Sequence, residues 1–238
     1  MDRKLVIIPT YNEKENIEAI IRKVLSLEGN FEILVVDDSS PDGTADIVKR
    51  LQIESPESIH ILEREGKQGL ATAYICGFKY ALDNNYDYAF EMDADFSHNP
   101  DDLERLYRAC SEEGAHVAIG SRYVTGVNVV NWPIGRVIMS YYASVYVRKI
   151  TGMPIKDATA GFLCYSRKAL ETIGIDKIKM KGYGFQIEMK YRAWRKGLNV
   201  KEVSIIFTDR TQGSSKMSSG IFGEAFWGVL ALRVRKIE

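Results

Sequence analysis

The sequence predicts an α/β fold in which helices flank a doubly wound, mostly parallel sheet. Two observations predict this class. Short apolar runs alternate with segments of helical periodicity through the first half of the chain, as in βαβ units with right-handed crossovers. The chain also has 238 residues without an internal repeat, low-complexity segment or linker, which favours a single domain spanning 1–238.

The first half carries the regular part of this pattern. Mostly apolar runs predict strands at 5–8, 33–36, 59–62, 88–93 and 117–119, and continuous apolar runs are typical of strands covered on both faces. Helices are predicted at 13–27, 44–51, 70–82 and 100–110. In the first of these, Ile17, Ile20, Ile21 and Val24 recur at helical spacing, as expected for one buried face.

The regular alternation ends after Arg122. Helices are predicted at 134–150, 185–196 and 220–236, and strands at 161–165 and 200–207. The first and last of these helices are apolar and aromatic, with Arg or Lys near their ends. That composition suits helices that lie on an anionic membrane surface. The alternative is that both helices pack on the sheet or form a dimer surface.

Composition and charge exclude several classes of protein. Lys plus Arg and Asp plus Glu number 32 each, so no global field favours nucleic acid, and no nucleic-acid partner is expected. The three cysteines are far apart and suit free thiols in a reducing compartment. The start of the chain does not resemble a signal peptide, and no stretch reaches the ~20 apolar residues of a membrane span. We therefore expect a cytoplasmic protein, soluble or bound to a surface.

Two aspartates one residue apart, Asp93 and Asp95, follow the strand that begins at Tyr88. Residues i and i+2 of a strand share a face, so both carboxylates leave the carboxyl end of the sheet, where open α/β sheets bind ligands. Carboxylates suit Mg²⁺ or Mn²⁺, and phosphate oxygens commonly complete the coordination of such an ion. The pair predicts a metal–diphosphate site. The alternative is that one aspartate caps the next helix and the other lies in a solvated loop.

The first two strand ends favour a nucleotide. Residues 9–13 lack the G-x-G-x-x-G of dinucleotide-binding folds. Tyr11 and Glu13 instead suit stacking on a base and hydrogen bonding to it or to ribose, unless they simply begin the helix. Asp37 and Asp38 end the second strand and can hold ribose hydroxyls or base amines. A receiver domain is disfavoured, because it carries its acidic pair on the first strand and is about half this length.

The third loop contains Gly66-Lys67-Gln68-Gly69. Lys67 can meet a diphosphate at the N-terminus of the following helix, although by itself the motif is also compatible with a plain turn that contains a lysine.

Together these motifs resemble the inverting GT-A glycosyltransferases of family 2. The resemblance rests on residues 9–13, 37–44 and 92–98, which occur in the family's order. Later segments narrow it to the dolichol-phosphate (polyprenyl-phosphate) mannose synthases, namely 120–124, 160–162, 182–188 and 210–216. The resemblance covers nearly the whole chain.

The resemblance implies roles for particular residues. Asp93, Asp95 and Ser97 would hold Mg²⁺ or Mn²⁺, although some relatives have glutamine at the Ser97 position. Arg122, Arg136 and Ser140 would bind the acceptor phosphate, and Asp95 and Arg122 are the expected catalytic residues. The nucleotide-sugar pocket would be formed by Pro9, Tyr11, Glu13, Val36, Asp38, Lys67, Asp93, Ala94, Asp95, Arg210 and Lys216.

The implied activity is an inverting transfer of mannose from GDP-mannose to polyprenyl (dolichyl) phosphate, with GDP as the other product. Residues 1–125 would bind the nucleotide sugar, and 126–238 would form the acceptor half, with interface helices near 134–150 and 220–236. The expected location is peripheral on the cytoplasmic face of the membrane, and an integral membrane partner is compatible with the family. The alternatives are a glucosyltransferase that uses UDP-glucose, a sugar nucleotidyltransferase and a nucleotide-sensing module.

Overall fold

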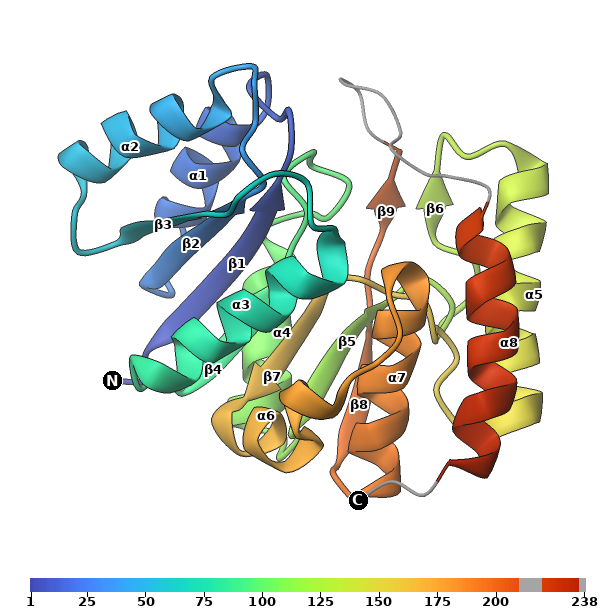
Figure 1. Cartoon of the computed structure of the whole chain (residues 1–238). Helices are drawn as coiled ribbons and strands as arrows, with labels where there is room; N and C mark the ends of the chain where they lie inside the picture. Colours follow the sequence, from blue (N-terminus) through green and yellow to red (C-terminus); the bar gives the residue numbers. More distant parts are fainter. Residues whose placement is uncertain (210–219, 236–238) are drawn as a thin grey trace.

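The computed structural model describes residues 1–209 and 220–235 (Figure 1). Within these residues, seven strands form the main sheet in the order β3-β2-β1-β4-β7-β5-β8. β7 is antiparallel to β4 and β5, and the other neighbours are parallel. The predicted mostly parallel sheet is therefore confirmed. The strands are β1 (Lys4–Thr10), β2 (Phe31–Asp37), β3 (Ile59–Glu63), β4 (Tyr88–Glu91), β5 (Val117–Ser121), β7 (Leu163–Ser166) and β8 (Val200–Ser204).

Helices cover both faces of this sheet (Figure 1). Alternate residues of β1 divide between two hydrophobic clusters, Leu5 and Ile7 in one and Val6 and Ile8 in the other, as the period of a strand requires. The first cluster includes α3 (Leu70–Asp83), α6 (Arg167–Ile173) and α7 (Gly182–Arg195), and a short 3-10 helix, η1 (Ile175–Lys177), follows α6. The second includes α1 (Ile17–Leu25), α2 (Thr44–Glu54) and α4 (Asp102–Ser111).

Two helices, α5 (Ile134–Thr151) and α8 (Gly220–Val234), lie side by side at the end of the molecule opposite α2 (Figure 1). The Tyr146 hydroxyl donates to the carbonyl of Phe226 at 3.0 Å, and the two rings stack at 4.9 Å. A small parallel sheet of β6 (Val129–Val130) and β9 (Phe207–Thr208) joins this part to the main sheet. None of the helices among residues 1–209 and 220–235 combines the length and apolar character that a membrane span requires.

Two predicted elements differ from the structure. The helix expected from residue 13 begins at Ile17, because the preceding loop is bound to the loop after β2. There the amide of Asn12 donates to Ser40 Oγ at 3.0 Å, and that of Glu13 donates to Thr44 Oγ1 at 3.1 Å. The strand expected over 200–207 is divided, since β8 joins the main sheet and β9 pairs with β6. The helix α6, the short helix η1 and the two-residue strand β6 were not predicted.

Candidate active site

The carboxyl ends of β1, β2 and β4 lie together because these strands are parallel neighbours. Pro9 is paired with Val36 and Thr10 with Asp37 in the register of β1 and β2. Asp37 is fully buried and accepts hydrogen bonds from Thr10 Oγ1 at 2.7 Å and from the amide of Ser40 at 2.8 Å. Its carboxylate therefore joins the two strand ends.

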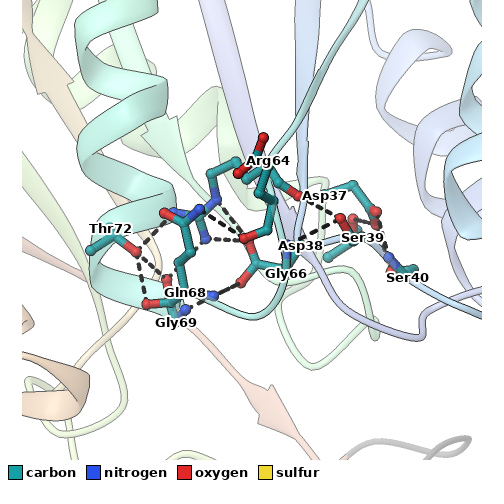
Figure 2. A network of polar contacts seen from close by, with 11 residues as sticks. Asp37, Asp38, Ser39, Ser40, Arg64, Gly66, Gln68, Gly69 and Thr72 are labelled. Atoms are coloured by element: carbon teal, nitrogen blue, oxygen red, sulfur yellow. Dashed lines mark hydrogen bonds and ion pairs between the residues drawn. The ribbon is translucent and has the colours of Figure 1, made fainter.

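Asp38 organises the neighbouring loop (Figure 2). Its Oδ1 accepts from Nε of Arg64 at 2.7 Å, and its Oδ2 accepts from the amides of Gln68 at 3.0 Å and Gly69 at 3.2 Å. The Arg64 guanidinium continues to Thr72 Oγ1 at 2.8 Å. Asp38 lies at the sheet edge where the sequence predicts the nucleotide pocket, and it also shapes the 66–69 loop.

The same loop carries Lys67 back to the end of β1. The Lys67 ammonium lies 4.7 Å from the centroid of the Tyr11 ring, a distance typical of a cation–π contact. The structure thus brings together two side chains that the sequence assigned to the nucleotide-sugar pocket. Glu13 is nearby in the chain and accepts from the side-chain amide of Asn16 at 3.2 Å.

The loop after β4 contains the expected metal ligands. Asp95 is buried, and its Oδ1 accepts from the amide of Ser97 at 3.0 Å, while Ala94 is buried between the two aspartates. The amide of Asp93 donates to Nδ1 of His98 at 3.2 Å. Burial lowers the pKa of His98 to about 4, so the ring is neutral near pH 7 and can accept this bond.

Three of the six described non-glycine residues with positive φ lie in these loops. Asn12, Ser39 and Phe96 have φ values of 56°, 52° and 59°, in the left-handed region that bulky residues such as Phe rarely adopt. They lie in the loops after β1, β2 and β4, respectively. Strained residues often occur at functional sites, and their positions mark this edge of the sheet.

The residues of the β4 loop fit a divalent cation. Ser97 Oγ is buried and has no hydrogen-bond partner among the described residues, although buried hydroxyls are normally paired. Within the same part of the chain, no group of three His, Cys, Asp or Glu residues gathers into a site. Asp93, Asp95 and Ser97 thus provide two carboxylates and a hydroxyl. That set suits Mg²⁺ or Mn²⁺ sites that take phosphate oxygens and water as further ligands.

A buried polar cluster supports the site from within the core. Glu91 and Lys190 are fully buried, and Gln186 lies between them, with its amide nitrogen donating to Glu91. Burial raises the pKa of Glu91 and lowers that of Lys190. The Lys190 ammonium also donates to the carbonyl of Ala160 at 2.7 Å. This cluster connects β4 and α7 to the segment before β7.

Among the acceptor-phosphate candidates, Arg122 is held by a buried ion pair. Its Nε and amide donate to Oδ2 of Asp157 at 2.7 and 2.9 Å, and a terminal nitrogen donates to Oδ1 at 2.6 Å. That nitrogen also donates to Thr159 Oγ1 at 2.9 Å. Burial raises the pKa of Asp157, but the charge and hydrogen bonds of Arg122 outweigh this and hold the pKa below its usual value.

The other two acceptor candidates lie on α5. Arg136 forms an ion pair with Asp209 at 2.9 Å, and Ser140 Oγ accepts from the Tyr123 hydroxyl at 2.8 Å. Tyr123 also lies under the guanidinium of Arg122, at 5.3 Å from ring centroid to guanidinium carbon. Tyr123 therefore connects two of the three candidates, Arg122 and Ser140.

Phe207 of β9 connects the two sides. Its ring lies 5.4 Å from His98 in the metal-candidate loop, 5.7 Å from the Arg122 guanidinium carbon and 5.2 Å from Trp132. The amide of Thr208 also donates to the carbonyl of Ser97 at 3.3 Å. These contacts place the acceptor candidates next to the expected metal loop.

Sequence reasoning missed several contributors to this site, and two predicted ones cannot be placed. Arg210 and Lys216 lie outside the described residues. The missed residues share no motif, because most of their contacts join distant parts of the chain; they are Arg64, Trp132, Asp157, Phe207 and Asp209. The pair Trp132 and Arg136, four residues apart around the start of a predicted helix, was the only signal available.

An open α/β sheet with an Asp-x-Asp pair beside a basic loop and two arginines is the arrangement expected of a GT-A type of nucleotide-sugar transferase. Residues 5–174 match the model of Glycosyl transferase family 2. The chain belongs to this family and is a glycosyltransferase. Family membership favours glycosyl transfer over the nucleotidyltransferase alternative.

Relatives match over nearly the whole chain. The polyprenol monophosphomannose synthase of Mycolicibacterium smegmatis is 45% identical over 233 residues, which cover 98% of this chain and 88% of the relative. The undecaprenyl-phosphate mannosyltransferase of Micrococcus luteus is 44% identical over 234 residues, covering 96% and 95%. The resemblance to polyprenyl-phosphate mannose synthases inferred from the motifs is confirmed.

Solved structures support the fold. Glucosyl-3-phosphoglycerate synthase from Mycobacterium tuberculosis, in complex with phosphoglyceric acid, gives a TM-score of 0.69 at 17% identity, over 97% of this chain and 80% of that one. The mannosyltransferase PcManGT from Pyrobaculum calidifontis, in complex with GDP-Man and Mn²⁺, gives 0.59 at 16% identity, over 98% and 70%. At these identities the likeness is one of fold, and it confirms the expected GT-A architecture.

Proposed function

We propose that the protein transfers mannose from GDP-mannose to a polyprenyl phosphate with inversion at the anomeric carbon. The observation that carries this proposal is the 44–45% identity, over nearly the full chain, to two relatives named as polyprenyl-phosphate mannose enzymes. The paired arginines near the Asp-x-Asp loop support it, because an anionic acceptor needs a cationic site beside the donor.

The donor would lie over the ends of β1, β2 and β4. The nucleotide would contact the β1–β2 edge, where Tyr11 and Asp38 are found, and Lys67 would meet the diphosphate. Asp93, Asp95 and Ser97 would hold Mg²⁺ or Mn²⁺, which would supply positive charge against the diphosphate. Arg210 and Lys216 are proposed to contact the donor as well, as the family resemblance implies.

Charge determines the reaction that this site can perform. A phosphate monoester acceptor is already an anion near neutral pH, so its oxygen can attack without a strong general base. The new bond joins this oxygen to the anomeric carbon, while the bond to GDP breaks and its electron pair leaves with GDP. Arg122 and Arg136 would bind and orient the acceptor phosphate, and Lys67 would offset the charge on the departing diphosphate.

The nucleotide and sugar are the parts of this proposal that need a direct test. The protein would be incubated separately with labelled GDP-mannose, UDP-glucose or UDP-GlcNAc, each with a short polyprenyl phosphate and either Mg²⁺ or Mn²⁺. Organic extraction then shows which sugar enters the lipid phase. We expect label only from GDP-mannose, and label from UDP-glucose instead would establish the glucosyltransferase alternative. An Asp95→Ala variant with wild-type turnover at saturating metal would refute the role of Asp95.

The same proposal places α5 and α8 on the membrane. α5 buries only Ser144, Val147 and Thr151, and large apolar side chains of both helices are exposed: Ile134, Ile138, Met139, Tyr141, Tyr142, Phe226 and Trp227. Basic residues follow at Arg148 and Lys149. Apolar and aromatic groups edged by cations suit the interface of an anionic bilayer. We propose a peripheral position on the cytoplasmic face, with or without an integral membrane partner, as the family resemblance implies.

Flotation with liposomes tests this position. We expect the protein to float with vesicles containing anionic lipid and to float less with neutral ones. Tyr142→Glu or Trp227→Glu should reduce flotation, because these side chains are 63% and 70% exposed. Ile53 is 83% exposed and belongs to α2, the helix at the opposite end of the molecule (Figure 1), so Ile53→Glu is a matched control. Equal flotation of all three variants and the wild type would show that this face does not bind the bilayer.

A further inference from the structure

Trp132, which lies between β6 and α5, contacts both arginines proposed to bind the acceptor phosphate. The guanidinium carbon of Arg136 lies 4.0 Å from the centroid of the Trp132 ring, and that of Arg122 lies 5.5 Å from it. Phe207 completes the cluster, with its ring edge-on to Trp132 at 5.2 Å. One indole is therefore shared by two guanidinium groups from separate elements.

The attraction between the Trp132 ring and the two arginines offsets the repulsion between their guanidinium groups. Two guanidinium groups that approach one phosphate repel each other before the anion arrives. Asp157 and Asp209 each balance one of them. The face of an indole attracts a guanidinium through its quadrupole, without occupying the N–H donors in the plane of the group. Trp132 can thus hold both cations without using the N–H donors in their guanidinium planes.

The indole N–H provides a second, independent observation. Nε1 of Trp132 is buried and has no hydrogen-bond acceptor among the residues that the structure describes. A buried tryptophan N–H usually has a partner, because leaving it unpaired costs free energy. An unpaired donor beside two arginines is what an anion-binding site presents before its anion is bound.

We propose that Trp132 is a positioning residue of the acceptor-phosphate site, where its ring holds Arg122 and Arg136 so that both reach one phosphate group. The ligand class is a phosphate monoester on a prenyl chain. This inference rests on the proposed function, since it takes from there the assignment of the two arginines to the acceptor.

Steady-state kinetics with GDP-mannose and a short-chain prenyl phosphate test this role. We expect Trp132→Ala to raise the KM for the prenyl phosphate about tenfold, the equivalent of a moderately desolvated cation–π contact. The KM for GDP-mannose should stay within about twofold, because the aromatic and cation–π contacts of the ring within residues 1–209 are with Arg122, Arg136 and Phe207, none of which is assigned to the donor. Trp132→Phe keeps an aromatic face and should restore most of the affinity for the acceptor.

A matched control comes from Trp194 of α7, a partly buried tryptophan that packs against Tyr191. Trp194→Phe should leave both KM values unchanged. Thermal unfolding of every variant separates loss of fold from loss of affinity. If Trp132→Ala raised both KM values equally, or if Trp132→Phe were as impaired as Trp132→Ala while folded, the positioning role would be overturned.

Arg136→Ala distinguishes this inference from the function on which it rests. If Arg136→Ala raised the KM for the prenyl phosphate but Trp132→Ala did not, Trp132 would have no positioning role and the proposed acceptor site would stand. If the wild-type protein transferred no sugar to any prenyl phosphate, the proposed function itself would fall, and this inference with it.

Discussion

Asp157→Asn is the substitution whose effect the structure predicts most directly. The Asp157 side chain is fully buried and accepts three hydrogen bonds from Arg122, which is itself 8% exposed. Asparagine preserves the shape but removes the negative charge and replaces one acceptor oxygen with a donor. Removing one partner of a buried ion pair costs about 3–5 kcal/mol, because the other charge stays buried without compensation. This is a large share of the ~5–15 kcal/mol that stabilises a typical domain.

The dependence of this effect on pH provides a stricter test. Although burial raises the pKa of Asp157, Arg122 holds it below the ordinary value of 3.8. A carboxyl whose pKa is lower in the folded state stabilises the protein above its unfolded pKa, and this contribution is lost as the pH falls through the folded value. The stability difference between wild type and Asp157→Asn should therefore be complete at pH 7. It should shrink below about pH 4.

Urea unfolding of both proteins from pH 7 to the acid limit of the native state measures this difference. A double variant, Asp157→Leu with Arg122→Met, should be more stable than Asp157→Asn, because replacing both ions leaves no buried charge. Glu18→Gln, which affects an exposed ion pair with Arg22, is a control that should change the midpoint little. A difference below about 1 kcal/mol at pH 7 would refute the reasoning, since that is the value of an exposed pair.

Three further predictions concern packing and the donor site. Gly77→Ala should destabilise the protein by about 1–3 kcal/mol, because the added Cβ would lie 2.5 Å from Cγ2 of Ile7. Gly135→Ala should not destabilise it, because a Cβ added there would meet no neighbouring atom of the described residues within 4 Å. Differential scanning calorimetry measures both effects. Ser97→Ala should leave the unfolding midpoint unchanged or slightly higher, since it removes a buried hydroxyl that has no partner among the described residues. It should also raise the metal concentration that gives half-maximal activity. An unchanged metal titration would show that Ser97 is not a metal ligand. Lys67→Met should raise the KM for the nucleotide sugar, and it should not alter stability, because Lys67 is exposed. Equal KM values for the variant and the wild type would show that this ammonium does not meet the diphosphate.

The local sequence pattern was sufficient to predict those helices and strands whose position is set by their own residues. The helix predicted at 134–150 is α5, Ile134–Thr151, and that predicted at 70–82 is α3, Leu70–Asp83. The aspartates at 93 and 95 follow β4 as expected, because an apolar strand and the two residues after it form one local unit. The direction of β7 could not be predicted, since an apolar run specifies a strand but not the neighbours with which it pairs.

The site shows the same division between local and distant information. Asp38 was predicted to lie at the nucleotide edge, but its bonds to Arg64 and to the amides of the 66–69 loop join residues 26–31 positions apart. Arg122 was predicted near the acceptor, but its partner Asp157 is 35 residues away. No spacing rule relates such residues, because crossovers and a reversed strand bring them together.

The amino-acid sequence by itself determined the class of fold, the carboxylate pair after β4 and the family to which the chain belongs. These features depend on short-range periodicity and on contiguous motifs, which survive without knowledge of the packing. Only the tertiary structure decided which charges are compensated: Asp37 and Asp38 became structural acceptors, Arg122 was paired with Asp157, and Trp132 came to lie against two arginines. The physical reason is that compensation of a buried charge depends on distances through space, and these are set when the sheet and its covering helices pack.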